Sequence, residues 1–111
     1  MGIRRIDQIW RKRSAEVRNA KVSFRDDLDE GEKLSGPPTV SPESGLTVDN
    51  EQVSVKALRI LGEVVNAGEA VQYRISGGTH GQAYDVTITV DTNASPPQTL
   101  EVVSTVIVDD T

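Results

Sequence analysis

Residues 75–90 of the chain read ISGGTHGQAYDVTITV, and this stretch decides the fold. Over residues 84–90 every second residue is apolar and the residues between them are polar. Such alternation is typical of a strand with one buried face and one solvated face. Gly77, Gly78 and Gly81 precede the strand and supply the backbone conformations of a tight corner, so we expect at least one positive φ among them.

A tyrosine opens this strand directly after the glycine-rich corner. Tyr84 in that place is similar to the corner tyrosine of immunoglobulin-like sandwiches, whose hydroxyl bonds to nearby backbone. The rest of the chain holds short apolar segments separated by turn signals, among them residues 26–32, Pro37-Pro38 and residues 93–98. This pattern predicts an all-β, immunoglobulin-like β-sandwich of about seven strands.

Length and composition limit the possible classes of protein. The 111 residues are enough for one domain with a single core. The chain has no cysteine, which excludes disulfides, thiolate metal sites and a cysteine nucleophile. Only four residues are aromatic, so Val, Ile and Leu must form most of the core. No apolar run has the length of a signal peptide or a membrane span, and we expect a soluble protein made in a cytoplasm.

The charges are divided unevenly along the chain. Residues 1–25 hold eight basic side chains against Asp7 and Glu16, a net charge of +6. The other 86 residues hold four basic and fifteen acidic side chains, a net charge of −11. This asymmetry predicts a basic arm that binds a partner of opposite sign. The partner could be an acidic protein surface, the acidic domain of the same or a neighbouring copy, or nucleic acid, although the acidic domain would repel phosphate.

The basic segment has a helical spacing of apolar residues. Ile3, Ile6, Trp10 and Val17 recur at intervals of three, four and seven, as on one face of a helix. A short amphipathic helix and an extended arm both fit, because so short a segment is marginal as a lone helix. We therefore expect an arm of residues 1–20, dispensable for folding but required for assembly, and a sandwich of residues 21–111.

The arm supplies the candidate partner-binding residues. Trp10 is predicted to be an interface anchor, since Trp and Arg are enriched at binding hot spots. In the alternative interpretation, Trp10 closes the bottom of the sandwich. The full predicted set is Ile3, Arg4, Arg5, Ile6, Ile9, Trp10, Arg11, Lys12 and Arg13.

No motif for catalysis, cofactors or metals is complete. The acidic stretch at residues 27–32 lacks the ligand spacing of an EF-hand and is interpreted as a solvated turn. His80 is the only histidine, so neither a histidine metal cluster nor a histidine-based relay can form around it. The glycine-rich corner lacks the lysine and helix of a phosphate-binding loop. Asn93-Ala94-Ser95 matches a glycosylation sequon but is interpreted as loop. We expect no enzyme activity, no cofactor and no metal.

Residues 21–109 carry an ordered set of motifs: the acidic turn at 28–32, a G-L-T-V segment at 45–48, the corner at 76–84, and the strand that follows. In this order they resemble a family of small immunoglobulin-like structural proteins of tailed bacteriophages, the fiber-tail adaptors. The resemblance covers 89 of the 111 residues and is most specific at Gly77, Gly78, Gly81 and Tyr84, the predicted structural corner. Phe24 alone represents the aromatic residues expected before the acidic turn, and residues 57–70 are less regular than the family pattern.

The resemblance implies a non-enzymatic virion protein that links tail and tail fiber through protein–protein contacts. Its partners would be other virion proteins, its place the tail of the particle, and its assembly a symmetric homo-oligomer. We expect no membrane partner, and a nucleic-acid-binding protein that uses residues 4–25 is a disfavoured alternative, because the acidic domain would repel phosphate. A head decoration or head-closure protein is the alternative within the same class. A carbohydrate-binding sandwich is the alternative outside it, although few aromatic side chains are present to stack on sugars.

Overall fold

The computed structural model describes residues 4–111, with side chains described from Trp10 onward. These described residues form nine strands and one short 3-10 turn at Arg25–Asp27. The strands are β1 (Arg4–Lys12), β2 (Arg18–Ser23), β3 (Leu34–Pro42), β4 (Leu46–Val53), β5 (Leu58–Ile60), β6 (Glu63–Val65), β7 (Ala70–Gly77), β8 (Ala83–Thr92) and β9 (Thr99–Val108). No helix in this part of the chain is long and apolar enough to cross a membrane.

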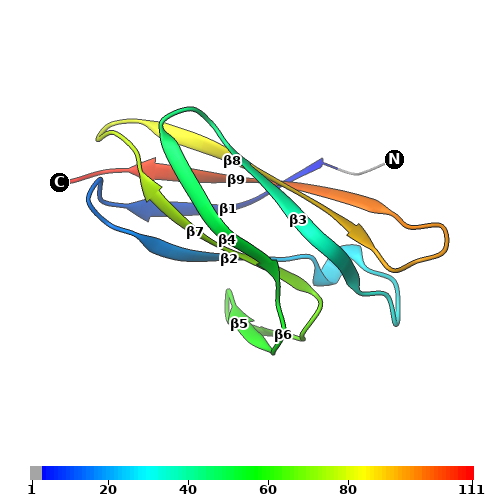
Figure 1. The fold of residues 1–111 in the computed structure, drawn as a ribbon. Helices are drawn as coiled ribbons and strands as arrows, with labels where there is room; N and C mark the ends of the chain where they lie inside the picture. Colours follow the sequence, from blue (N-terminus) through cyan, green and yellow to red (C-terminus); the bar gives the residue numbers. More distant parts are fainter. Residues whose placement is uncertain (1–3) are drawn as a thin grey trace.

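Two sheets form the body of the molecule, and a small hairpin projects from it (Figure 1). One sheet has the order β1-β9-β8-β3 and the other the order β2-β7-β4, while β5 and β6 pair only with each other. Seven strands thus make up the two main sheets. The predicted all-β sandwich is confirmed, and its immunoglobulin-like character stays a prediction.

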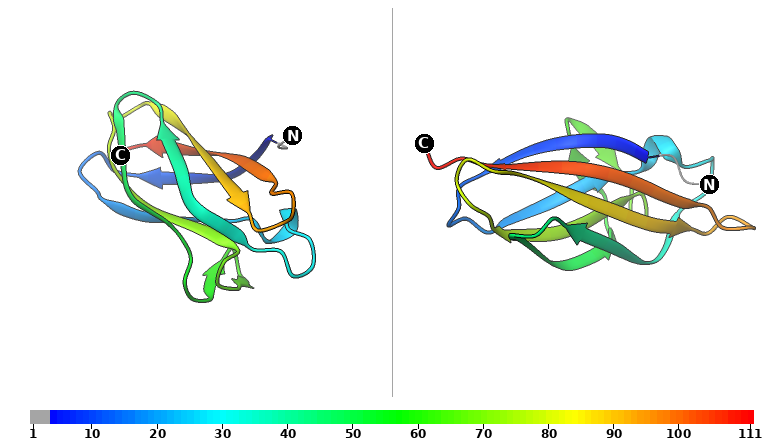
Figure 2. Two further views of the ribbon diagram at one scale, coloured as in Figure 1. Left: turned by 45° about the vertical axis from the view of Figure 1, so that its right-hand side comes forward. Right: turned by 90° about the horizontal axis from the view of Figure 1, so that it is seen from above.

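The core lies between the two sheets, whose layers can be followed in the views of Figure 2. The alternation predicted for β8 is confirmed, because every second side chain from Tyr84 to Val90 is buried. Strand β7 contributes Val71, Tyr73 and Ile75 from the opposite sheet. Phe24 is fully buried where β2 ends. The small number of aromatic residues is therefore used almost entirely inside the core.

Strand β3 lies at the edge of the four-stranded sheet, and its prolines favour that position. Its pairing with β8 shifts in register between Ser35 and Thr39, where Pro37 and Pro38 lie. Proline cannot donate a ladder hydrogen bond, so within sheets it is confined to edges and irregularities. A proline-containing edge also discourages pairing with the edge of another molecule.

The N-terminal segment is a strand, and the helix considered for it is wrong. Strand β1 runs parallel to β9, with Arg4 opposite Glu101 and Lys12 opposite Val108. Backbone groups along the edge of β9 need partners, and β1 supplies them, whereas a lone helix of this length would be marginal. Strand β2 also crosses the expected boundary at residues 20 and 21. Residues 4–20 therefore belong to the sandwich instead of forming an arm outside it.

Candidate interaction surface

The glycine-rich corner connects β7 to β8 and is held by backbone hydrogen bonds. Gly77, Gly78 and Gly81 all have positive φ, at 79°, 94° and 87°, so the prediction for the corner is confirmed. The Thr79 N–H donates to the Tyr84 hydroxyl at 2.8 Å. A β-carbon on Gly78 would lie 2.6 Å from the Val108 side chain, so only glycine fits there. The corner is a structural feature that fixes the start of β8.

Lys12 supports the same corner from β1. Its side chain is only 2 % exposed, and its Nζ donates to the Gly77 carbonyl at 2.6 Å. It donates also to the carbonyls of Arg13 at 2.7 Å and Ser14 at 3.4 Å. A buried ammonium that is shared among backbone carbonyls cannot also reach a partner protein. Lys12 therefore has a structural role, and its inclusion in the predicted partner-binding set is wrong.

The structure describes the other residues at the start of the predicted partner-binding set to different extents. Ile3 lies outside the described residues, and Arg4, Arg5, Ile6 and Ile9 are described only as backbone positions of β1 beside β9. Trp10 is half-buried and packs against the main core. Its indole Nε1 is buried and has no hydrogen-bond partner among the described residues. This position agrees with the alternative in which Trp10 closes one side of the sandwich.

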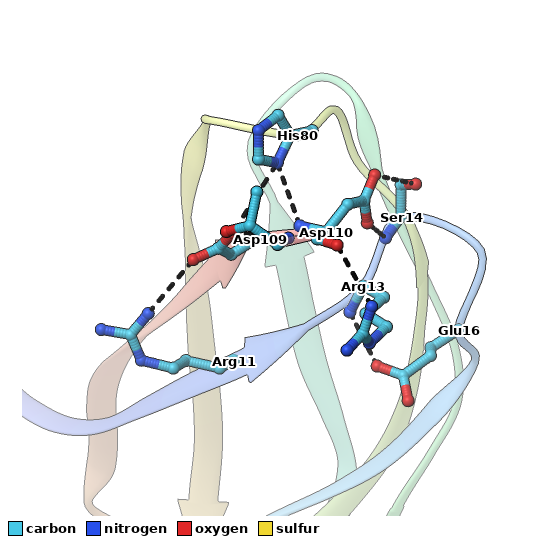
Figure 3. A network of polar contacts seen from close by, with 8 residues as sticks. Arg11, Arg13, Ser14, Glu16, His80, Asp109 and Asp110 are labelled. Carbon is cyan, nitrogen blue, oxygen red and sulfur yellow. Dashed lines mark hydrogen bonds and ion pairs between the residues drawn. The ribbon is translucent and has the colours of Figure 1, made fainter.

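The end of β1 meets the C-terminal residues in a polar network (Figure 3). The Asp110 carboxylate accepts from the Ser14 N–H at 2.7 Å and from the Ser14 hydroxyl at 2.8 Å. The Asp110 N–H donates to His80 Nδ1 at 3.0 Å. Arg13 donates to the Asp110 carbonyl at 3.1 Å, and the Arg11 guanidinium lies 3.8 Å from the Asp109 carboxylate. The basic segment thus pairs in part with the acidic end of its own chain.

Hydrogen bonds and nearby cations lower the pKa values of the two aspartates in the network. Hydrogen bonds from the Ser14 backbone and side chain hold the pKa of Asp110 below its ordinary value, with His80 and Arg13 acting in the same direction. The pKa of Asp109 is lowered by hydrogen bonds from the Thr111 hydroxyl and amide, and then by His80 and Arg11. Each carboxylate therefore stays ionised at neutral pH and stabilises this end of the fold.

Basic side chains remain exposed around the network. The Arg11 side chain is 70 % exposed, and its ion pair with Asp109 is long. Arg18 is exposed and lies 3.5 Å from Glu16. A depression of about 370 Å³ is lined by Arg11, Lys12, Arg13, Glu16, Arg18, Asp109 and Thr111. Exposed ion pairs contribute little to stability, so these guanidinium groups can exchange their present partners for carboxylates of another protein.

The acidic turn at residues 27–32 is more ordered than a solvated turn. Glu32 is buried, and its carboxylate accepts from the Asp29 N–H at 2.9 Å and from the Gln98 side chain at 3.0 Å. These bonds, the Asp29 bond first, lower the pKa of Glu32. Glu32 thus ties this turn to the loop between β8 and β9. Over residues 4–111 no group of three or more histidine, aspartate or glutamate side chains is placed to hold a metal ion.

The outer face of the three-stranded sheet carries a polar groove that the sequence did not suggest. Its volume is about 660 Å³, and its lining includes Lys21, Gln72 and Arg74. The Arg74 guanidinium holds the Asp49 carboxylate through two hydrogen bonds of 2.8 and 2.9 Å. Polar residues alternating with the buried ones in β2 and β7 were the only available signal. That alternation identifies a solvated sheet face, and gives no indication of a groove.

A family model described as podophage GP4 fiber-tail adaptor protein gp77 matches residues 12–107 of the chain. The match covers 96 of the 111 residues, from the end of β1 to the end of β9. No curated protein and no solved structure matches the chain. Because the family model spans most of the sandwich, including the corner and the acidic turn, the chain belongs to the podophage fiber-tail adaptor family.

Proposed function

We propose that this protein is a non-enzymatic virion component that links the tail of a bacteriophage to its tail fibers through protein–protein contacts. The family match over residues 12–107 is the observation that carries the proposal. The fold is in keeping with it, because a rigid β-sandwich with structured edges can hold two neighbours at a fixed separation. Copies would assemble as a symmetric ring, which repeats each contact around the tail axis.

The exposed basic residues at the end of β1 and the start of β2 are the proposed electrostatic contact with a neighbouring virion protein. Arg11, Arg13 and Arg18 are exposed there, in a chain whose net charge is −5. Charges at the rim of an interface mainly increase the association rate and orient the partners. Lys12 has no part in this contact because its ammonium is buried. Arg4 and Arg5 extend the basic segment toward the start of β1.

Phage particles that lack the gene for this protein provide the test. We expect such particles to have tails without fibers, and purified full-length protein to restore fiber attachment. Restoration should weaken as salt is added, because exposed charges are screened over about 10 Å at 0.1 M ionic strength. Particles that carry fibers normally without the protein would contradict the proposal. Unstable or empty heads with normal fibers would instead support the head-closure alternative.

A further inference from the structure

The β5–β6 hairpin projects from the sandwich and is closed by a two-residue turn (Figure 1). The turn residues Leu61 and Gly62 have φ values of 51° and 82°. Positive φ at both central residues is the signature of a type I′ turn. Arg59 donates to the Gly62 carbonyl at 3.2 Å and holds the turn closed. A small separate core of Leu58, Ile60, Val65 and Ala70 fastens the hairpin to β7.

Leu61 is an unfavourable residue for this position. Type I′ turns prefer Asn-Gly, because glycine and asparagine tolerate positive φ whereas leucine is strained there. The Leu61 residue is also 79 % exposed, so it gains little packing against the described part of the chain. Val64, on β6 opposite Arg59, is 50 % exposed. Residues held in unfavourable backbone conformations are concentrated at functional sites such as ligand clamps and switch regions.

The charges around the hairpin differ from those of the rest of the domain. Residues 55–65 contain Lys56, Arg59 and Glu63, a net charge of +1. The remainder of residues 26–111 has a net charge of −12. The hairpin therefore presents an apolar tip with basic neighbours, which fits an apolar pocket bordered by carboxylates. The 660 Å³ groove of the chain itself has a mostly polar lining that does not match a leucine, and the proposed adaptor role favours a pocket on a different protein.

We propose that Leu61, with Val64 beside it, inserts into an apolar pocket on a neighbouring subunit of a different virion protein, while Lys56 and Arg59 face carboxylates at the rim of that pocket. This inference rests on the proposed function and identifies one of the surfaces through which the adaptor makes its contacts. Enclosure of the Leu61 side chain by the partner would remove its apolar surface from water, which favours binding.

Leu61→Asn separates binding from folding, because it creates the preferred Asn-Gly turn and removes the apolar tip. We expect its melting temperature to rise by about 4 °C as the strain is relieved. We also expect about tenfold weaker incorporation into adaptor-deficient particles, or a comparable loss of fiber attachment. Leu61→Met keeps an apolar side chain and should retain incorporation and attachment near the wild-type level.

The two proposals fail in different ways in the same experiment. Wild-type protein that does not enter adaptor-deficient particles would overturn the proposed function and this inference with it. Wild-type protein that enters and attaches fibers, together with a Leu61→Asn variant that does both equally well, would overturn this inference alone. A lower melting temperature for Leu61→Asn would also count against it, because the turn would then not be strained.

Discussion

Tyr84 and Lys12 hold the same corner from two sides. The tyrosine hydroxyl accepts the Thr79 N–H within the corner, and the lysine ammonium reaches the Gly77 carbonyl from β1. Both side chains are buried, so each bond replaces water at a backbone group that would otherwise be unsatisfied. The corner therefore links the N-terminal strand to the strand pair at the centre of the core.

Substitutions of Tyr84 separate the ring from its hydroxyl. Tyr84→Phe should lower the free energy of unfolding by ~1 kcal/mol, because it removes one hydrogen bond and leaves the ring in place. Tyr84→Ala should lower it by ~3–5 kcal/mol, because it also leaves a cavity. Denaturant unfolding of both variants measures the difference. Equal midpoints for Tyr84→Ala and the wild type would show that the ring is not part of the core.

Glycine substitutions in the corner test space and conformation separately. Gly78→Ala places a β-carbon 2.6 Å from Val108 in addition to the positive φ. Gly81 has a similar φ, but a β-carbon there would meet open space. Gly81→Ala should therefore cost ~1 kcal/mol from conformation alone, and Gly78→Ala clearly more. The free energies of unfolding from denaturant titrations give the comparison. Equal losses would mean that Val108 moves aside without cost.

Strand β1 shows where a local sequence pattern stops being informative. The spacing of Ile6, Trp10 and Val17 fits a helix, yet the segment pairs with a strand that begins at Thr99. A period read over twenty residues contains no information about a pairing partner so distant in the chain. The segment forms a strand because the open edge of β9 offers it ladder hydrogen bonds. A helix of the same residues in solvent would lack tertiary contacts to stabilise it.

Removing residues 1–11 should destabilise the sandwich, contrary to the expectation that residues 1–20 are dispensable. The truncation exposes the edge of β9 and removes Trp10 from the core surface. We expect a loss of at least ~2 kcal/mol, on the scale of a few backbone hydrogen bonds at about 1 kcal/mol each. Arg4→Gln/Arg5→Gln is the control that removes charge and keeps the strand. Thermal melting of the truncated protein at the wild-type temperature would show that β1 contributes nothing to stability.

The network between the C-terminus and the β1–β2 turn should respond to acid. The pKa of Asp110 is lower in the folded protein than its ordinary value of 3.8. Its carboxylate therefore stabilises the fold fully above pH 3.8, and this effect is lost as the pH falls through the lower pKa of the folded state. Asp110→Asn should therefore be less stable than the wild type at neutral pH, and the difference should narrow below pH 3.8. Denaturant midpoints of Asp110→Asn and the wild type at several pH values measure this difference, with Glu30→Gln as an exposed control. A difference that stays constant with pH would contradict this role of Asp110.

At the scale of the whole molecule, the sequence predicted the class of fold and the family better than the surfaces. The alternation from Tyr84 to Val90 is a local signal, and the structure confirms it because the apolar residues of this stretch face the core. The burial of Lys12 has no such signal, since lysine is normally exposed and only the packing of β1 against the corner encloses it. The positive φ of Leu61 could not be predicted either, because Gly62 indicates a turn but does not show that the residue before it is strained.

The charge division has a partly different meaning from the one predicted. Residues 4–25 of the +6 segment belong to the sandwich, and two of the arginines contact the acidic C-terminal residues of the same chain. Arg11, Arg13 and Arg18 line the depression beside the C-terminal residues, while the β5–β6 hairpin projects from the side of the sandwich (Figure 1). The two proposed contact surfaces would give an adaptor separate sites for two neighbours.

Electron cryomicroscopy of the intact phage particle tests the adaptor role most directly. The reconstruction should contain copies of this sandwich, 46 × 27 × 21 Å in extent, arranged symmetrically around the tail axis. Each copy should contact a tail protein on one side and a fiber protein on the other. Copies found only on the head shell, or particles that contain none, would contradict the account.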